Sequence, residues 1–592
     1  MIKINNILPN KIMPLAFTSK PAEQSGNVNT AKEKDYKEVV LSEYLESIGI
    51  INSASVKKVQ RKPSPAPENY KNDLRTLIQN NQSVMLAISP RTFTAKDLNG
   101  DDIIMLTEGE KPGSLLSAID RLDELKNDGY NTIHILPIHP PGTKNAMGTA
   151  GSVYSPAKFL EEDGTLAIES ILIEQDDPRS PSEQFKAFIN ECHKRGIRVM
   201  LDLPSCASVT WYENEKPLMA FGLNEEDRTP QGWADIRMFE PWVDESKRTL
   251  NPKLLELHKQ YVDACIDLGI DGIRADVARA KPVEFWDILI PYSREKDPEF
   301  AWLAESYTYE CASPQVNMPY DRPEDSLRAG FDEYYGQYHI FHQWGTATEF
   351  NDYVKHNLAM SQRLDVGKTC IGSFMTHDDE AAMNHGGEIY CNLTTILQST
   401  IPMCNPYFVD GFQTGDYYNY KYSNKYSKES LTDSFKMKHH DYKFEIFNFA
   451  RQPGGDCPDI QRVIQETLKM RKENLDLFAD KNSSFIELDK YGDKKDQIIT
   501  YARHNNGRTA IVIANKNPNR HISGTVKVPG LSATQELNNM APVYGEERSE
   551  FQVAKGELRV NLAPAGAYVF EINTPNIEYD RKGHVFKQKT HN

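Results

Sequence analysis

The chain has 592 residues, too many for one ordinary hydrophobic core, so we expect two or more domains. Hydrophobic residues make up 39% of the sequence, which is enough to build packed cores rather than a disordered polymer. The formal net charge is −16, and the sequence shows no concentrated basic cluster. This argues against nucleic acid or an anionic membrane as a partner and favours a neutral substrate.

The sequence also bears on the compartment. It contains no uninterrupted run of 18 apolar residues, so we expect no membrane-spanning helix, and its first residues do not resemble a signal peptide. The eight cysteines are scattered without paired spacing, which indicates reduced thiols rather than a disulfide framework or a zinc site. We therefore expect a cytoplasmic protein. Nothing in the sequence indicates an oligomeric state.

Residues 1–75 differ in composition from the rest of the chain. They are rich in Lys, Asn, Ser and Glu and include the proline cluster RKPSPAPENY. We expect a flexible N-terminal tail and linker here, with one short helix at 36–48.

Beyond the linker, strand-like runs alternate with amphipathic helical stretches. The strand-like runs are SVMLAI (83–88), TIHILPI (132–138), IRVMLDLP (197–204), GIRAD (272–276), EFAWLAES (299–306), FDEYYG (331–336), CIGSFMTHDD (370–379) and TIPMCNPY (400–407). The helical stretches cover 115–128, 180–196, 252–269, 282–290, 349–360 and 459–474. Repeated β-then-α units imply a parallel sheet, and about eight units favour a closed (β/α)8 TIM barrel over a doubly wound sheet.

The remaining segments complete the predicted domain organisation. We place the barrel at 76–204 and 253–480, interrupted by an inserted subdomain at 205–252 after the third strand. A second excursion at 408–457 carries the tyrosine-rich run GDYYNYKYSNKYS. Strand-like runs separated by turn residues then predict a C-terminal antiparallel β-sandwich at 481–575, followed by a polar tail at 576–592.

Charged residues follow several of the predicted barrel strands. They are Asp202, Arg274, Asp276, Glu305, His377 and Asp378. Side chains at the carboxyl ends of barrel strands face the active site of such folds. A single Asp at a strand end is more often a helix cap or a surface residue, but several charged endings in one barrel indicate a functional site.

Two of the carboxylates are expected to lie in unlike surroundings. Arg274 and Asp276 are alternate residues of one strand and share a face, so the cation would hold Asp276 ionised. Glu305 follows the next strand and has fewer obvious cationic neighbours, so it could keep a proton. An ionised carboxylate beside a protonated one is the arrangement that glycosidases use as nucleophile and acid.

Four segments together resemble glycoside hydrolase family 13, the α-amylase family, over residues 83–575. They are RVMLDLP, DGIRADVAR, FAWLAES and SFMTHDD, in the expected order and on successive appropriate strands. The resemblance implies an enzyme that acts on α-glucosidic bonds with retention, so its substrates would be α-glucans or maltooligosaccharides. It assigns the roles of nucleophile to Asp276, general acid/base to Glu305 and assisting carboxylate to Asp378.

The same resemblance implies a set of substrate-binding residues. Arg274 would orient Asp276, Asp202 would support the floor of the site, and His377 would bind sugar hydroxyls. Tyr154 in GSVYSPAKF would stack under the sugar ring, although it could simply be a loop aromatic. The retaining mechanism predicts carboxyl groups about 5–5.5 Å apart on Asp276 and Glu305.

The chain departs from the family pattern at two signatures. Cys206 and Ala207 stand where the family usually has Asn and His, and Arg279 and Ala280 stand where it usually has Lys and His. Arg279 can still donate hydrogen bonds to sugar hydroxyls. Because the residues that the family uses to hold calcium are absent, we expect no required metal and no other cofactor.

These departures leave three functions open. The leading one is an α-glucan hydrolase or transglycosylase. The run that contains Lys281, Pro282, Phe285 and Trp286 is also similar to the maltosyltransferases that use maltose 1-phosphate. A catalytically silent barrel, retained as a carbohydrate-binding or interaction module, is the third possibility, and the intact set of catalytic carboxylates argues against it.

Overall fold

The computed structural model describes residues 65, 67, 69–96, 98, 109–146, 151–216, 235–307, 322–364, 369–416, 457–573, 578–579 and 585–586. The helix expected at 36–48 lies outside these residues, as does most of the tyrosine-rich excursion. Within the described part of the chain, none of the helices has the length and apolar character needed to cross a membrane.

The barrel consists of eight parallel strands, the last of them in two pieces. Its segments are β1 (Met85–Ile88), β2 (Thr132–Ile135), β3 (Arg198–Leu203), β8 (Gly272–Ala275), β9 (Ala301–Ala304), β10 (Glu333–Tyr334), β11 (Thr369–Ile371), β12 (Cys404–Asn405) and β13 (Tyr407–Val409). Each pairs with its neighbours in the order β12-β11-β10-β9-β8-β3-β2-β1-β13. Since β12 and β13 are separated only by Pro406, the sheet closes and the predicted TIM barrel is confirmed.

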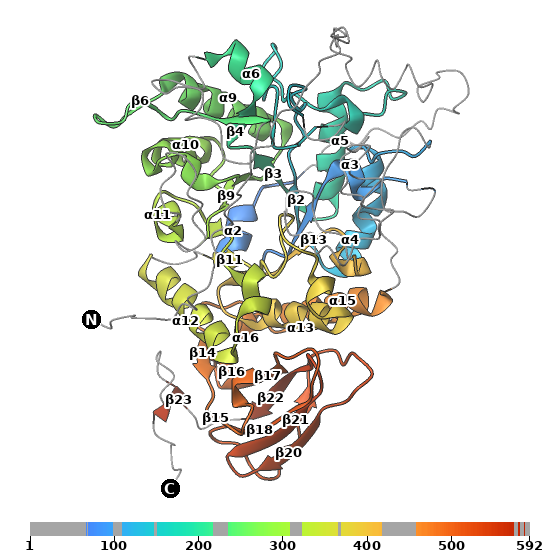
Figure 1. Ribbon diagram of the computed structural model, residues 1–592, viewed down its shortest axis with the longest axis vertical. Helices are drawn as coiled ribbons and strands as arrows, with labels where there is room; N and C mark the ends of the chain where they lie inside the picture. The colour runs from blue at the N-terminus through green and yellow to red at the C-terminus, as the bar shows by residue number, and fades with distance from the viewer. Residues whose placement is uncertain are drawn as a thin grey trace, which may run out of the picture. The chain divides into compact units, whose positions relative to one another are not determined.

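Helices precede, alternate with and follow these strands, and most of them lie around the outside of the barrel (Figure 1). They are α2 (Leu74–Gln79), α3 (Pro90–Phe93), α4 (Leu122–Asp128), α5 (Pro181–Lys194), α9 (Pro252–Leu268), α10 (Val283–Lys296), α11 (Pro323–Arg328), α12 (Ala347–Arg363), α13 (Gly387–Thr400), α15 (Pro458–Glu473) and α16 (Leu475–Phe478).

The boundaries of α5 and α9 follow from their sequences. Ser180 and Glu183 form a capping box at the start of α5, with proline at the first helical position. Asn251 accepts the first backbone N–H groups of α9, and Gly269 ends that helix at φ 99°, a conformation that glycine adopts without a steric penalty.

The insertion after β3 and the C-terminal domain are both built from antiparallel strands. The described part of the insertion holds β4 (Cys206–Ser208), α6 (Val209–Asn214), β5 (Ile236–Met238), β6 (Trp242–Asp244) and β7 (Thr249–Leu250). The C-terminal domain holds β14 (Ser484–Glu487), β15 (Lys490–Tyr491), β16 (Ile498–Asn505), β17 (Arg508–Asn515), β18 (Ile522–Lys527), β19 (Asn538–Asn539), β20 (Glu550–Ala554), β21 (Glu557–Leu562) and β22 (Ala567–Asn573). Five of its strands form one sheet and four form another, which confirms the predicted sandwich. Short strands β23 (Glu578–Tyr579) and β24 (Val585–Phe586) pair with each other.

The seventh strand is shorter than the sequence predicts. The run CIGSFMTHDD was expected to be strand up to the charged residues, but β11 ends at Ile371. The N–H groups of Ser373 and Phe374 bond to carbonyls only two residues back, so they leave the ladder. Gly372 also packs so closely on Gln398 that an added Cβ would lie 2.1 Å from its Oε1, which allows no regular strand side chain there. His377 and Asp378 therefore belong to a loop after β11.

Candidate active site

Three adjacent strands bring the predicted carboxylates together. In the ladder Asp202 of β3 pairs with Arg274 of β8, and Arg274 pairs with Leu303 of β9. Asp276 directly follows β8, and Glu305 directly follows β9. Neighbouring strands thus place the four charged side chains at one end of the sheet.

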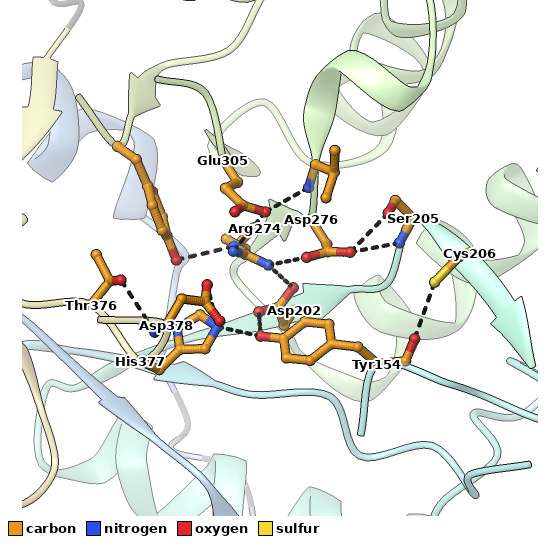
Figure 2. Close-up of polar contacts among 12 residues, drawn as sticks. Tyr154, Asp202, Ser205, Cys206, Arg274, Asp276, Glu305, Thr376, His377 and Asp378 are labelled. Atoms are coloured by element: carbon orange, nitrogen blue, oxygen red, sulfur yellow. Dashed lines mark hydrogen bonds and ion pairs between the residues drawn. The ribbon is translucent and has the colours of Figure 1, made fainter. Parts of the chain in front are cut away.

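Arg274 lies at the centre of this cluster and is fully buried. Its Nη1 lies 3.0 Å from Asp202 Oδ1 and 2.8 Å from Asp276 Oδ1, and its Nη2 lies 2.9 Å from Glu305 Oε2. Its Nε donates to the hydroxyl of Tyr335 at 3.1 Å. Figure 2 shows the three carboxylates converging on the one guanidinium. Buried charges are stable only when they are paired with opposite charges, so these ion pairs keep the four side chains in place.

Asp276 accepts hydrogen bonds on both carboxylate oxygens. Arg274 donates to Oδ1, while the backbone N–H and the hydroxyl of Ser205 donate to Oδ2 at 3.1 and 2.8 Å. The Asp276 side chain retains 12% exposure, whereas Arg274 and Asp202 have none. A carboxylate that is both fixed and accessible is suited to attack a bound substrate.

Glu305 holds its proton more tightly than an ordinary glutamate. Burial raises its pKa to about 7, and this effect outweighs the opposing charge of Arg274; the nearby charge of Asp276 raises it further. Glu305 was expected to have fewer cationic neighbours than Asp276, but Arg274 contacts both carboxyl groups directly. The predicted protonated state nevertheless follows, because desolvation is the larger effect.

The backbone at Val277, which contacts Glu305, is strained. The N–H of Val277 donates to Glu305 Oε2 at 2.7 Å, and Val277 has φ 37° and ψ 62°. A β-branched residue in the left-handed region costs on the order of 1–3 kcal/mol, and such strain is concentrated at active sites. The turn that joins Asp276 to the 3₁₀ helix η4 (Ala278–Ala280) is therefore held by its contact with Glu305.

The loop after β11 adds His377 and Asp378 to the cluster. The hydroxyl of Tyr154 lies 2.7 Å from His377 Nε2 and donates to Asp202 Oδ2 at 2.9 Å, and the two rings stack nearly parallel. His377 Nε2 also lies 3.4 Å from Asp378 Oδ2. Burial beneath the surrounding protein and the nearby charge of Glu305 raise the pKa of Asp378 well above its usual range, although 36% of its side chain remains exposed.

Several residues of the site were not predicted from the sequence, among them His134, Tyr335, Ser205 and Tyr307. The hydroxyl of Tyr307 donates to Glu305 Oε1 at 3.3 Å. His134 in β2 bonds to Asp202 Oδ2 and to the Tyr407 hydroxyl, fully buried inside the barrel. A polar residue in the apolar run TIHILPI was a detectable signal, because inward-facing polar groups in a barrel need partners.

The residues that depart from the family pattern take other positions. Cys206 Sγ donates to the carbonyl of Tyr154 at 3.1 Å, and Ala207 is buried in β4. Arg279 and Ala280 lie in η4 and are partly exposed, and the role predicted for Arg279 stays a prediction. Among the residues that the structure describes, no group of three or more His, Cys, Asp or Glu side chains is arranged to hold a metal ion. Independence from metal likewise stays a prediction.

No family model matches the chain. It is 22% identical over 428 residues to α-1,4-glucan:maltose-1-phosphate maltosyltransferase of Corynebacterium glutamicum, covering 70% of this chain and 57% of the relative. It is 22% identical over 478 residues to the protein of the same name from Picrophilus torridus, covering 76% of this chain and 66% of that relative. The chain thus spans less than two thirds of the length of these relatives.

Solved structures resemble the fold over nearly their whole length. A maltogenic α-amylase of Thermotoga neapolitana matches with a TM-score of 0.58 at 18% identity, over 83% of this chain and 99% of the other. A debranching enzyme of Nostoc punctiforme matches with a TM-score of 0.54 at 16% identity, over 83% and 98%.

The fold and the side chains at its strand ends define a (β/α)8 barrel of the α-amylase type with a C-terminal β-domain. The chain resembles glycoside hydrolase family 13 in sequence and in fold, with sequence similarity to the α-1,4-glucan:maltose-1-phosphate maltosyltransferases. These relatives and structural neighbours are enzymes by name, which agrees with the prediction that this chain is an enzyme.

Proposed function

We propose that the protein is a retaining enzyme of α-glucans, a hydrolase or transglycosylase of the α-amylase type, with Asp276 as nucleophile and Glu305 as general acid/base. The observation that supports it most directly is the sharing of one buried guanidinium by two carboxyl groups in unlike surroundings. Asp276 accepts three hydrogen bonds, whereas burial raises the pKa of Glu305 to about 7. These are the conditions for a nucleophile and an acid in one site.

In the first step, a carboxylate oxygen of Asp276 attacks the anomeric carbon while the bond from that carbon to the leaving oxygen breaks. Glu305 gives its proton to the leaving oxygen and becomes ionised, a charge that Arg274 then stabilises. The product of this step is a β-glycosyl ester on Asp276.

In the second step, the ionised Glu305 takes a proton from water or from a sugar hydroxyl, whose oxygen attacks the same carbon. The ester bond breaks and Asp276 leaves as a carboxylate, so the configuration at the anomeric carbon is retained. In this proposal Tyr154 and Asp378 bind the sugar ring during both steps, Tyr154 through its ring face and Asp378 through its carboxylate oxygens, and the partial exposure of both residues supports these roles.

A second candidate differs only in the donor. Maltose 1-phosphate would replace the oligosaccharide, and inorganic phosphate would be the leaving group. The sequence relatives named maltosyltransferases favour this donor. Lys281, which contributes to that similarity, is buried; its ammonium lies 3.5 Å from the carbonyl of Ser205 and 5.4 Å from the ring centroid of Phe239.

The test is product analysis with maltooligosaccharides, with and without inorganic phosphate, and with maltose 1-phosphate. We expect new or shortened oligosaccharides from the native enzyme and loss of turnover by several orders of magnitude in Asp276→Asn. Release of phosphate from maltose 1-phosphate would select the second donor. Unchanged turnover in Asp276→Asn would reject the proposed mechanism, and inactivity of the native enzyme on every donor would favour the silent barrel.

Asp271→Asn provides a matched control. Asp271 directly precedes β8, the strand that Asp276 follows, and like Asp202 it is buried. It accepts hydrogen bonds from His193 Nε2 at 2.9 Å and from the backbone N–H of Val199 at 2.7 Å. We expect this variant to lose stability but to retain turnover, because its carboxylate lies outside the cluster around Arg274.

A further inference from the structure

The last residue of β3 and the segment that follows it hold Asp276 from two sides. The carbonyl of Leu203 accepts the backbone N–H of Asp276 at 3.1 Å. Two residues later, Ser205 donates its own N–H and its hydroxyl to Asp276 Oδ2. Figure 2 shows Ser205 on the side of Asp276 away from Arg274. Asp276 Oδ1 therefore accepts one hydrogen bond, from Arg274 of β8, and Oδ2 accepts two, from Ser205 in the short connection between β3 and β4.

From this we propose that Ser205 is a positioning residue that fixes the carboxylate of Asp276 and stabilises it as the leaving group of the second step. The inference rests on the function proposed above. It concerns the loop of the altered first signature, which was the main argument for a silent barrel. In this proposal the loop donates hydrogen bonds to the nucleophile Asp276 through Ser205, which the family pattern does not predict.

The surroundings of Ser205 make it rigid. Only 2% of the residue is exposed, and its carbonyl lies 3.5 Å from the buried ammonium of Lys281. The next residue, Cys206, donates its thiol to the carbonyl of Tyr154 and begins β4. Because little conformational entropy is left to lose, the hydroxyl of Ser205 keeps its direction without cost at each turnover.

The chemistry predicts which step depends on the hydroxyl. A hydrogen bond to an ionised carboxylate is stronger than one to an ester carbonyl. When the ester breaks, negative charge returns to the carboxyl group of Asp276, and the donors of Ser205 strengthen as it does so. When the ester forms, that charge is lost. Removing the hydroxyl disturbs the orientation in both steps, but it withdraws charge stabilisation only from the second.

The experiment compares Ser205→Ala, Ser205→Thr and Ser208→Ala, with α-maltosyl fluoride as donor. Fluoride leaves without a proton, so the first step becomes independent of Glu305. Ser208 is the matched control, since it is a fully buried hydroxyl three residues along that caps α6 through the N–H of Trp211 and touches none of the site carboxylates.

For Ser205→Ala we expect kcat to fall roughly 10- to 100-fold, as the loss of one charge-assisted hydrogen bond implies. We also expect the glycosyl ester to accumulate in the steady state, seen as added mass on the intact protein, and KM to fall with kcat. Ser205→Thr, which keeps the hydroxyl, restores most of the rate. Ser208→Ala lowers the melting temperature and leaves kcat near the native value.

Two results would overturn the inference. One is native kcat in Ser205→Ala. The other is a fall in kcat without accumulation of the ester, which would indicate a merely structural role. Either result leaves the proposed function intact, provided that Asp276→Asn remains inactive. Turnover that survives in Asp276→Asn would instead reject the nucleophile itself.

Discussion

The protonation of Glu305 gives a prediction of the pH dependence of activity. Burial raises its pKa from 4.5 to about 7, even though the Arg274 guanidinium lies 2.9 Å from the carboxyl group. If Glu305 is the general acid, the active free enzyme is the form in which it is protonated. We therefore expect kcat/KM for maltooligosaccharides to fall as the pH rises through about 7.

The size of the fall follows from the same pKa. One unit above it the protonated fraction is about one tenth, so kcat/KM near pH 8 is about tenfold below its plateau, and near pH 9 about a hundredfold. The assay is initial-rate kinetics from pH 5 to 9 at constant ionic strength, with maltooligosaccharide in one series and α-maltosyl fluoride in the other. Fluoride needs no proton to leave, so we expect the alkaline fall to disappear with that donor.

Two outcomes would refute this reasoning about Glu305. If kcat/KM falls equally at alkaline pH with both donors, the titrating group is not the acid of the first step. If kcat/KM with maltooligosaccharide still falls at alkaline pH in Glu305→Gln, another group titrates. In that variant we expect a low rate that is independent of pH between 6 and 9.

Two further substitutions probe the support of the site and the barrel interior. Tyr154→Phe removes the hydroxyl that donates to Asp202 and keeps the ring. In steady-state kinetics we expect kcat to fall about tenfold with KM little changed. A change in KM alone would contradict the role of this hydroxyl in supporting Asp202. Glu333, fully buried and bonded to Asn405, has its pKa raised to about 8 by burial. The folded state then holds this proton more tightly than the unfolded state, so stability is lost as the pH rises from about 4.5 to 8. Glu333→Gln removes this loss, and its advantage in the free energy of unfolding grows by about 3–4 kcal/mol between pH 5 and pH 8. Parallel unfolding curves for the two proteins at both pH values would contradict this.

Much of the alternation of strands and helices was readable because most barrel strands are apolar runs followed by amphipathic helices. The helices expected at 180–196 and 252–269 match α5 and α9 to within two residues at each end. The helix α13 was not predicted, and it is buried along most of its length. The seventh and eighth strands were less predictable, since their ends depend on contacts far along the chain. Gln398 of α13 packs against Gly372 and also accepts the N–H of Tyr407, so one side chain shapes both strands.

The charged members of the site were readable for a similar reason. Asp276 and Glu305 are single charges at the ends of apolar runs, and such placement is costly without a partner. The partners themselves were not readable. Ser205 follows the predicted third strand and Tyr335 lies in the predicted run 331–336, and only the pairing of β3, β8, β9 and β10 brings them to Asp276 and Arg274. A protonated Glu305 was predicted because it has fewer obvious cationic neighbours in the sequence. In the structure, burial is the main effect that raises its pKa.

The most direct test of the account is to trap the intermediate on Asp276. In Glu305→Gln with α-maltosyl fluoride the first step proceeds without an acid, but the second lacks its base, so the glycosyl ester accumulates. Digestion and mass spectrometry would then locate the sugar. The account predicts one maltosyl group on the peptide that contains Asp276. A maltosyl group on another carboxylate, or no adduct while fluoride is released at the native rate, would contradict it.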